Sequence, residues 1–280
     1  MVKEKIKNNI EKLSVTYSKI ELFTSVNQPV KIICEDAAEV LFAIINDTMC
    51  GGTGGSGWDN LDGGEVKNSS YVQSRKCKNC GTKITFFKDT CPTCGSKFKD
   101  LKSPKDARWG IGAKSHFDNY DELKEYRLCL TEPVKDHPSC REFRVRFWNI
   151  PKDSLHLNKY ATGQYESPKS NHINFQPLKN DFYLSRPVLI IDGILKINEN
   201  GTNTFDYNFF DLNNQTPEEI PEEYIPEEYK KEYRLTGEVP EKLSEEVIEK
   251  KKFGKDRGKT SRQSLSKNSS EQKNLSGFLV

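Results

Sequence analysis

The residues with the clearest chemical potential lie between Trp58 and Ser70, in the sequence WDNLDGGEVKNSS. Asp59 precedes an Asp-Gly-Gly turn, and Glu65 and Lys67 follow the turn with one residue between them. Because side chains alternate along a strand, Glu65 and Lys67 share one face, about 6–7 Å apart, and the turn folds Asp59 back beside them. The two carboxylates and the Val66 carbonyl are suitable ligands for a hard cation such as Mg²⁺. Lys67 can hold a phosphate oxygen and orient or deprotonate an attacking water, which predicts phosphodiester hydrolysis.

An upstream helix, predicted over about residues 30–48, offers a further carboxylate. Glu35 and Glu39 are four residues apart, so they lie on the same helical face. We prefer Glu39 because Leu41 and Phe42 can bury the helix around it. Glu35 is the alternative.

This set of residues resembles the catalytic motif of the PD-(D/E)XK nuclease superfamily, above all of its restriction endonucleases. The matching positions are Asp59, Glu65 and Lys67, and the branch that contains the mismatch-repair nicking endonuclease has a similarly short spacing and a helical glutamate, here Glu39. Asp62 is the rival of Asp59, but it lies only three residues before Glu65, so we expect it to begin the turn. The resemblance implies an α/β core with a mixed central sheet flanked by helices. It also implies magnesium-dependent cleavage of DNA to a 3′-hydroxyl and a 5′-phosphate.

Two CxxC pairs follow the hairpin, and each is followed by a glycine. They consist of Cys77, Cys80, Cys91 and Cys94. Four thiolates with this spacing predict a closed, tetrahedral and structural zinc site, and the segment resembles a zinc ribbon with a small hairpin over residues 83–88. Disulfides are the alternative, but nothing in the sequence indicates an oxidising compartment. The other four cysteines have no paired spacing and fit reduced thiols in a cytoplasmic protein.

The ribbon is also strongly basic. Residues 75–105 hold nine lysines and arginines and two aspartates, a net charge of +7. Clustered positive charge on a small rigid module is typical of phosphate binding, and a solvated surface is the simpler interpretation.

Four segments are expected along the chain. They are N-terminal helices and the catalytic hairpin over 1–73, the zinc ribbon insertion over 74–104, the rest of the core over 105–236, and a charged, disordered tail over 237–280. The first segment begins with one amphipathic helix over about residues 1–24 and contains a glycine-rich loop at 51–57, which is either a linker or a loop that closes over DNA.

Three apolar or alternating runs in the third segment predict core strands. They cover residues 125–131, 142–148 and 187–196, and the last is either one strand or a pair with a turn at Asp192-Gly193. Arg144 and Arg146 share one face of the second strand, which touches either DNA or solvent. The polar segment 149–179 has side chains of the kind that read base edges.

The combined pattern predicts a type II restriction endonuclease that cuts a specific site in double-stranded DNA with Mg²⁺, and that contains structural Zn²⁺. Cleavage of both strands of a symmetric site implies a homodimer, and a cognate DNA methyltransferase is expected to protect the host genome. A repair nickase or junction resolvase with the same triad, and a non-enzymatic zinc-ribbon regulator, are the alternatives. No apolar run has membrane-spanning length, so we expect a cytoplasmic protein with no membrane partner.

Overall fold

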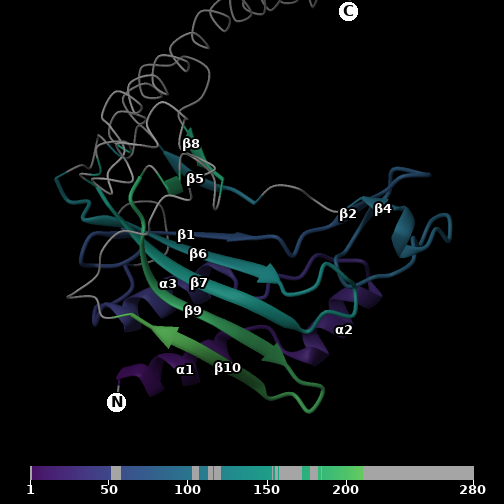
Figure 1. The fold of residues 1–280 in the computed structure, drawn as a ribbon, viewed down its shortest axis with the longest axis horizontal. Helices are drawn as coiled ribbons and strands as arrows, with labels where there is room; N and C mark the ends of the chain where they lie inside the picture. Colours follow the sequence, from purple (N-terminus) through teal and green to yellow (C-terminus); the bar gives the residue numbers. More distant parts are fainter. Residues whose placement is uncertain are drawn as a thin grey trace, which may run out of the picture.

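A five-stranded mixed sheet in the order β1-β6-β7-β9-β10 forms the centre of the protein (Figure 1). The computed structural model describes residues 2–51, 58–102, 107–112, 116, 121–152, 154, 157, 172–176, 182–183 and 185–210. The strands are β1 Gly64–Ser70, β6 Glu125–Pro133, β7 Glu142–Pro151, β9 Val188–Ile197 and β10 Asn203–Phe209. β1 pairs with β6 in parallel, and the other pairs are antiparallel. The predicted α/β class with a mixed sheet is confirmed, and so are the strands expected at 125–131 and 142–148.

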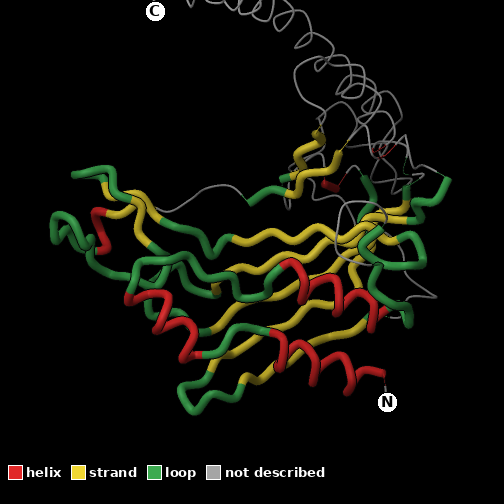
Figure 2. Tube along the Cα trace, turned by 180° about the vertical axis from the view of Figure 1, so that it is seen from behind, coloured by secondary structure: helices red, strands yellow, loops and turns green. Residues whose placement is uncertain are grey.

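The helices of the described chain cover one face of this sheet (Figures 1 and 2). They are α1 Val2–Leu13, α2 Tyr17–Ser25 and α3 Glu35–Ile45. Their apolar residues, among them Ile6, Ile20 and Phe42, are buried in one cluster with Phe147 of β7. The rings of Phe42 and Phe147 pack edge to face, with 5.1 Å between their centroids. The core therefore lies between the helical layer and the sheet.

The prediction of one continuous helix over about residues 1–24 is wrong. Two helices are present, because Thr16 caps α2 by accepting a hydrogen bond from the Lys19 N–H, and the Val15 N–H donates to the Ile32 carbonyl. A capping hydroxyl satisfies a free N–H at a helix start, so it favours a new start over continuation.

The second expected helix is shorter than residues 30–48. Val30, Ile32 and Ile33 are buried in a non-helical segment that bends at residues 32–33 and precedes α3. Valine and isoleucine are branched at Cβ and lose rotamer freedom in a helix. This run is therefore more stable outside a helix, where its side chains are buried in the core.

Residues 188–197 form one strand, so a turn at Asp192-Gly193 is wrong. A Cβ atom on Gly193 would lie 2.5 Å from Cβ of Tyr207 and 2.6 Å from the Phe205 ring. The glycine is needed because β10 packs closely there, and not because the chain reverses.

The other face of the sheet is partly covered by a two-stranded sheet of β5 (Trp109–Gly112) and β8 (His172–Phe175). A second apolar cluster lies under it and includes Trp109, Trp148 and Phe182. Most of the predicted base-reading segment 149–179 lies outside the described residues, and so do the tail 237–280 and residues 52–57 of the glycine-rich loop. In the part of the chain that is described, no helix is long and apolar enough to cross a membrane.

The cysteine-rich module lies beyond the carboxyl ends of β1 and β6 (Figure 1). It has a three-stranded sheet in the order β3-β2-β4 and one short 3₁₀ helix, with bounds β2 Arg75–Cys77, β3 Lys83–Ile84, η1 Phe98–Asp100 and β4 Leu101–Lys102. The hairpin expected over residues 83–88 is wrong: β3 pairs with β2, and Phe86 and Phe87 leave the module and enter the main core. The module is therefore docked on the core through its own side chains.

Candidate functional site

The hairpin before β1 places Asp59 at the free edge of the sheet. Asn60 forms a bridge with Gly64, and the turn between them needs Gly63, whose φ is +89°. The Val66 N–H donates to Oδ2 of Asp59 at 2.7 Å. The N–H and C=O of one strand residue point to the same side, so the Val66 carbonyl also faces this edge.

Glu65 and Lys67 lie at alternate positions of β1, so their side chains share one face. The Lys67 ammonium is 2.5 Å from Oε1 of Glu65 and 3.9 Å from Oδ2 of Asp59. All three side chains are about three-quarters buried, with 21–26% exposed. Burial raises the pKa of Glu65; Lys67 opposes this rise, and Asp59 adds to it. The hairpin thus brings together the three residues that the sequence predicted to converge.

The two candidate helical carboxylates differ in their surroundings. Burial raises the pKa of Glu39, and the charges of Asp59 and Glu65 raise it further, which places Glu39 within electrostatic reach of the hairpin. Glu35 is largely exposed and pairs with Lys31. Its partial burial raises the pKa of the carboxyl, but the pairing with Lys31 outweighs this effect, and the pKa is lowered. The surroundings favour Glu39 as the fourth member of the site.

We expect Glu39→Gln to reduce Mg²⁺-dependent DNA cleavage about 10–100-fold, because the charges of Asp59 and Glu65 act on this carboxyl and its backbone is bonded to Asn60 of the hairpin. Glu35→Gln is the matched control on the same helix and is expected to stay close to the unsubstituted protein. Single-turnover cleavage rates measure both. The reverse order of activities would assign the role to Glu35.

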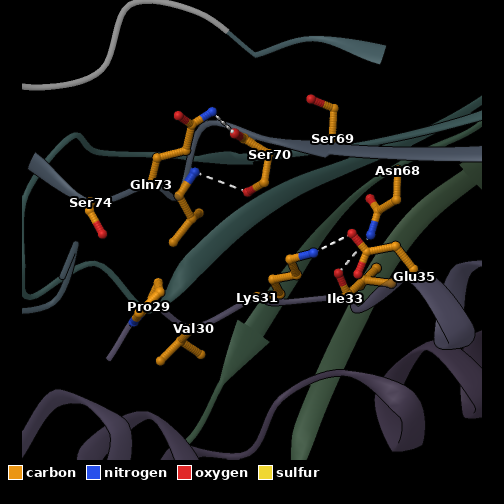
Figure 3. A pocket seen from close by; sticks show the side chains of 11 residues that line it. Pro29, Val30, Lys31, Ile33, Glu35, Asn68, Ser69, Ser70, Gln73 and Ser74 are labelled. Carbon is orange, nitrogen blue, oxygen red and sulfur yellow. Dashed lines mark hydrogen bonds and ion pairs between the residues drawn. The ribbon is translucent and has the colours of Figure 1, made fainter. Parts of the chain in front are cut away.

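A pocket of about 300 Å³ lies beside the carboxyl-terminal half of β1 and the segment that follows it (Figure 3). The segment around Lys31 and Glu35 forms one wall. The opposite wall is formed by Asn68, Ser69, Ser70, Val72, Gln73 and Ser74. The lining combines polar side chains of β1 with apolar ones such as Val30, Ile33 and Val72.

The four cysteines of the module come together at one point. Sγ of Cys77 lies 3.6 Å from Sγ of Cys94, Sγ of Cys80 lies 3.5 Å from Sγ of Cys91, and all four sulfurs are within 4.8 Å of one another. Among the described residues, this is the only group of three or more His, Cys, Asp or Glu side chains gathered so closely. The group could hold a metal ion.

Each CxxC pair closes in the same way. The Gly81 N–H donates to the Cys77 carbonyl, the Gly95 N–H donates to the Cys91 carbonyl, and both glycines have positive φ, at 75° and 72°. The backbone N–H of Cys80 lowers the pKa of the Cys77 thiol to about 6. Thiolates bind Zn²⁺, and four cysteine sulfurs within 4.8 Å of one another are suitable ligands for one such ion.

Arg75 does not belong to the basic surface of the module, which corrects one part of the sequence interpretation. Its side chain is fully buried, donates to the Phe86 carbonyl, and pairs with Asp136 at 2.7 Å. Its guanidinium also lies over the rings of Phe86 and Phe98, at 4.2 and 4.6 Å from their centroids. Arg75 thus anchors the module to the core, and the exposed positive charges are lysines.

The arginines of β7 are paired with carboxylates. Arg144 makes two hydrogen bonds with Asp192 at 2.8 and 2.6 Å, and Arg146 pairs with Glu132 and lies over Trp148. These contacts favour a structural role over direct contact with DNA.

Sequence reasoning missed two residues next to the hairpin. Arg127 of β6 is fully buried and pairs with Asp62, and Asn60 is fully buried between the hairpin and α3. Asp62 lies within the turn and does not begin it, because the Gly63 N–H donates to the Asn60 carbonyl. Its pairing with Arg127 makes it a weaker candidate for binding a cation than Asp59. The alternating charge of Glu125 and Arg127 was the available signal, but it is common on solvated strands.

An edge strand with Glu65 and Lys67 beside Asp59, in a mixed α/β sheet, is the arrangement expected of a restriction endonuclease-like nuclease. The model of the MamI restriction endonuclease family matches residues 22–223, which include the hairpin and the cysteine-rich module. The chain therefore belongs to the MamI restriction endonuclease family and is a DNA endonuclease of a restriction system. Searches of curated proteins and of solved structures gave no significant match.

Proposed function

We propose that this protein is a type II restriction endonuclease that cuts a specific site in double-stranded DNA with Mg²⁺. The observation that carries the proposal is the grouping of Asp59, Glu65 and Lys67 at the free edge of β1. Family membership supplies DNA as the substrate. The segments 1–73, 74–104, 105–236 and 237–280 stay our proposed division of the chain.

The donor set of the proposed site fits Mg²⁺. Its proposed ligands are the carboxylates of Asp59 and Glu65 and the Val66 carbonyl, all oxygen ligands, which suit a hard cation. Burial and mutual repulsion raise the pKa values of Glu39 and Glu65, so a divalent cation would relieve an excess of negative charge. When bound, Mg²⁺ would stabilise the charge that develops on the phosphate during hydrolysis.

The chain's own groups have separate proposed roles. Lys67 holds a nonbridging oxygen of the scissile phosphate and orients the attacking water, after its ammonium has moved from Glu65 toward the substrate. Glu39 completes the acidic rim and favours the catalytic position of the hairpin. The polar side chains of residues 68–70 follow Lys67 along β1, and we propose that they lie near the backbone of the cleaved strand (Figure 3).

Two further proposals concern the partners of the protein. Cleavage of both strands of a symmetric site requires two catalytic hairpins, which supports a homodimer on DNA. A restriction activity also requires a cognate methyltransferase that protects the same site in the host genome.

The test is to incubate the purified protein with plasmid DNA in the presence and absence of Mg²⁺. Discrete linear fragments that appear only with Mg²⁺ are the expected result. Nicked circles or a general smear would favour a nickase or resolvase. Intact plasmid at all Mg²⁺ concentrations would favour a DNA-binding regulator and contradict the proposal.

The lysines of the module are expected to contact DNA phosphates. Lys76 and Lys83 are exposed and lie directly opposite each other on β2 and β3. Like charges placed opposite each other are destabilising unless an anion lies nearby. The module begins beyond the end of β1, about 17 Å along the strand from Glu65, which is the length of about five base pairs.

Replacement of both Lys76 and Lys83 by Ala is expected to weaken binding to cognate and noncognate duplexes equally. The slope of log K against log salt should flatten by about 1.8, because each lost phosphate contact removes about 0.9. The control variant replaces Lys5 and Lys12 on α1 by Ala, with the same change in net charge. The choice of cleavage site should not change, since phosphate contacts carry no sequence information. If the salt dependence of binding is the same in the unsubstituted protein and in both variants, the module does not contact DNA.

A further inference from the structure

A buried arginine lies directly beneath the catalytic hairpin. Arg127 is 0% exposed and makes a two-point contact with Asp62, at 2.9 and 2.5 Å. Its Nε donates to Glu125 at 2.9 Å. Room for the guanidinium comes from Gly64, where an added Cβ would lie 2.3 Å from Cζ of Arg127. A planar guanidinium with several donors holds its partners in fixed directions, so the turn is fastened to β6.

A buried amide extends this contact to the helix. Oδ1 of Asn60 accepts from Arg127 at 2.6 Å, and Asn60 is 0% exposed. Nδ2 of the same side chain donates to the backbone carbonyl of Glu39 at 3.1 Å and to that of Asp59 at 3.1 Å. One side chain therefore bonds to α3, to the hairpin and to β6 at the same time.

The bonds of the Asn60 amide connect the backbone of Glu39 on α3 with the backbone of Asp59 on the hairpin. Glu39 and Asp59 repel each other at neutral pH, so their separation must be enforced by the surrounding structure. The helix and the hairpin are far apart in the sequence, and the Asn60 amide uses both of its N–H donors to join them. A buried amide with all of its groups bonded is expensive to disturb, which makes it suitable for this task.

We propose that Asn60, held in place by Arg127 and Asp62, is a positioning residue that sets the distance between Glu39 and the Asp59 hairpin and so prepares the acidic site for its divalent cation. The proposal rests on the proposed Mg²⁺-dependent function. Asn60 does not touch substrate in this role; it acts through the backbones of Glu39 and Asp59.

The test compares Asn60→Ala with Asn46→Ala. Asn46 donates its side-chain amide to the Phe42 carbonyl of the same helix at 2.9 Å, so the control also removes one side-chain bond to α3. Mg²⁺ affinity is measured by calorimetry without DNA, and cleavage is measured over a Mg²⁺ titration at a temperature where both variants are folded. Asn60→Ala is expected to raise the Mg²⁺ dissociation constant and lower kcat, each about 10–100-fold, with an unchanged KM for DNA. Asn46→Ala is expected to stay within about twofold of the unsubstituted protein.

Equal Mg²⁺ affinity and kcat in the Asn60→Ala variant and its control would overturn the proposal. If Asn60→Ala does not fold, Asn60→Leu is judged by the same criteria, because it has a similar volume and no charge and removes the bonds to Glu39 and Asp59. Plasmid left intact by the unsubstituted protein would reject the proposed function instead. The calorimetric comparison then still decides whether Asn60 prepares the cation site.

Discussion

Single substitutions Asp59→Ala, Glu65→Ala and Lys67→Ala are expected to abolish DNA cleavage, with losses of at least about 10³-fold in the single-turnover rate. The reason is geometric: one ammonium lies 2.5 Å from one carboxylate and 3.9 Å from the other, at the same edge of β1. Removal of any member leaves the proposed cation or the scissile phosphate without a principal contact. Full activity in a correctly folded variant would remove that residue from the catalytic set.

Glu122→Ala and Lys124→Ala are the matched controls, because both side chains belong to the loop beside the hairpin. They should retain cleavage. A further control is Glu65→Gln, which should be inactive yet melt no lower than the unsubstituted protein in the absence of Mg²⁺. Burial raises the folded-state pKa of Glu65, so its stabilising contribution is complete below the unfolded pKa and is lost as the pH rises through the folded pKa. At neutral pH the ionised side chain therefore destabilises the fold, and the neutral amide does not.

Loss of metal from the four cysteines is expected to destabilise the whole domain. One zinc ion per chain should be present, and Cys91→Ser or a strong chelator should remove it. The melting temperature should fall by about 10 °C, because metal bound tightly and only by the folded state contributes about 4 kcal/mol of stability. The effect should reach the core, since Phe86 and Phe87 of the module pack there.

Cys34→Ser is the control, because Cys34 is exposed at the start of α3 and does not belong to the sulfur cluster. It should retain the zinc ion and the melting temperature. Metal analysis by mass spectrometry and thermal unfolding monitored by circular dichroism provide the two measurements. A well-folded, freshly purified protein with much less than one zinc ion per chain would contradict the assignment.

Local spacing alone determined the features that depend on neighbouring residues. The CxxC-Gly pairs predicted a sulfur cluster, and the structure brings the four thiols within 4.8 Å. The alternation of Glu65 and Lys67 after an Asp-Gly-Gly turn predicted their shared face, because strand geometry alternates side chains every residue. Short-range patterns also predicted the three core strands β6, β7 and β9, whereas the mixed α/β class was implied by the resemblance to the nuclease superfamily.

Tertiary contacts decided the remaining features, because burial and pairing join residues that are far apart in the chain. The preference for Glu39 over Glu35 rests on charges of the hairpin, and Arg75 is internal because Asp136 and Phe86 surround it. Gly193 is a close-packing residue only because β10 lies against it. The bond from Arg127 to Asn60 spans 67 residues. No periodic pattern in the sequence encodes which distant partner satisfies a buried polar group. The contacts of Arg127 and Asn60 beneath the site were therefore decided by the tertiary structure.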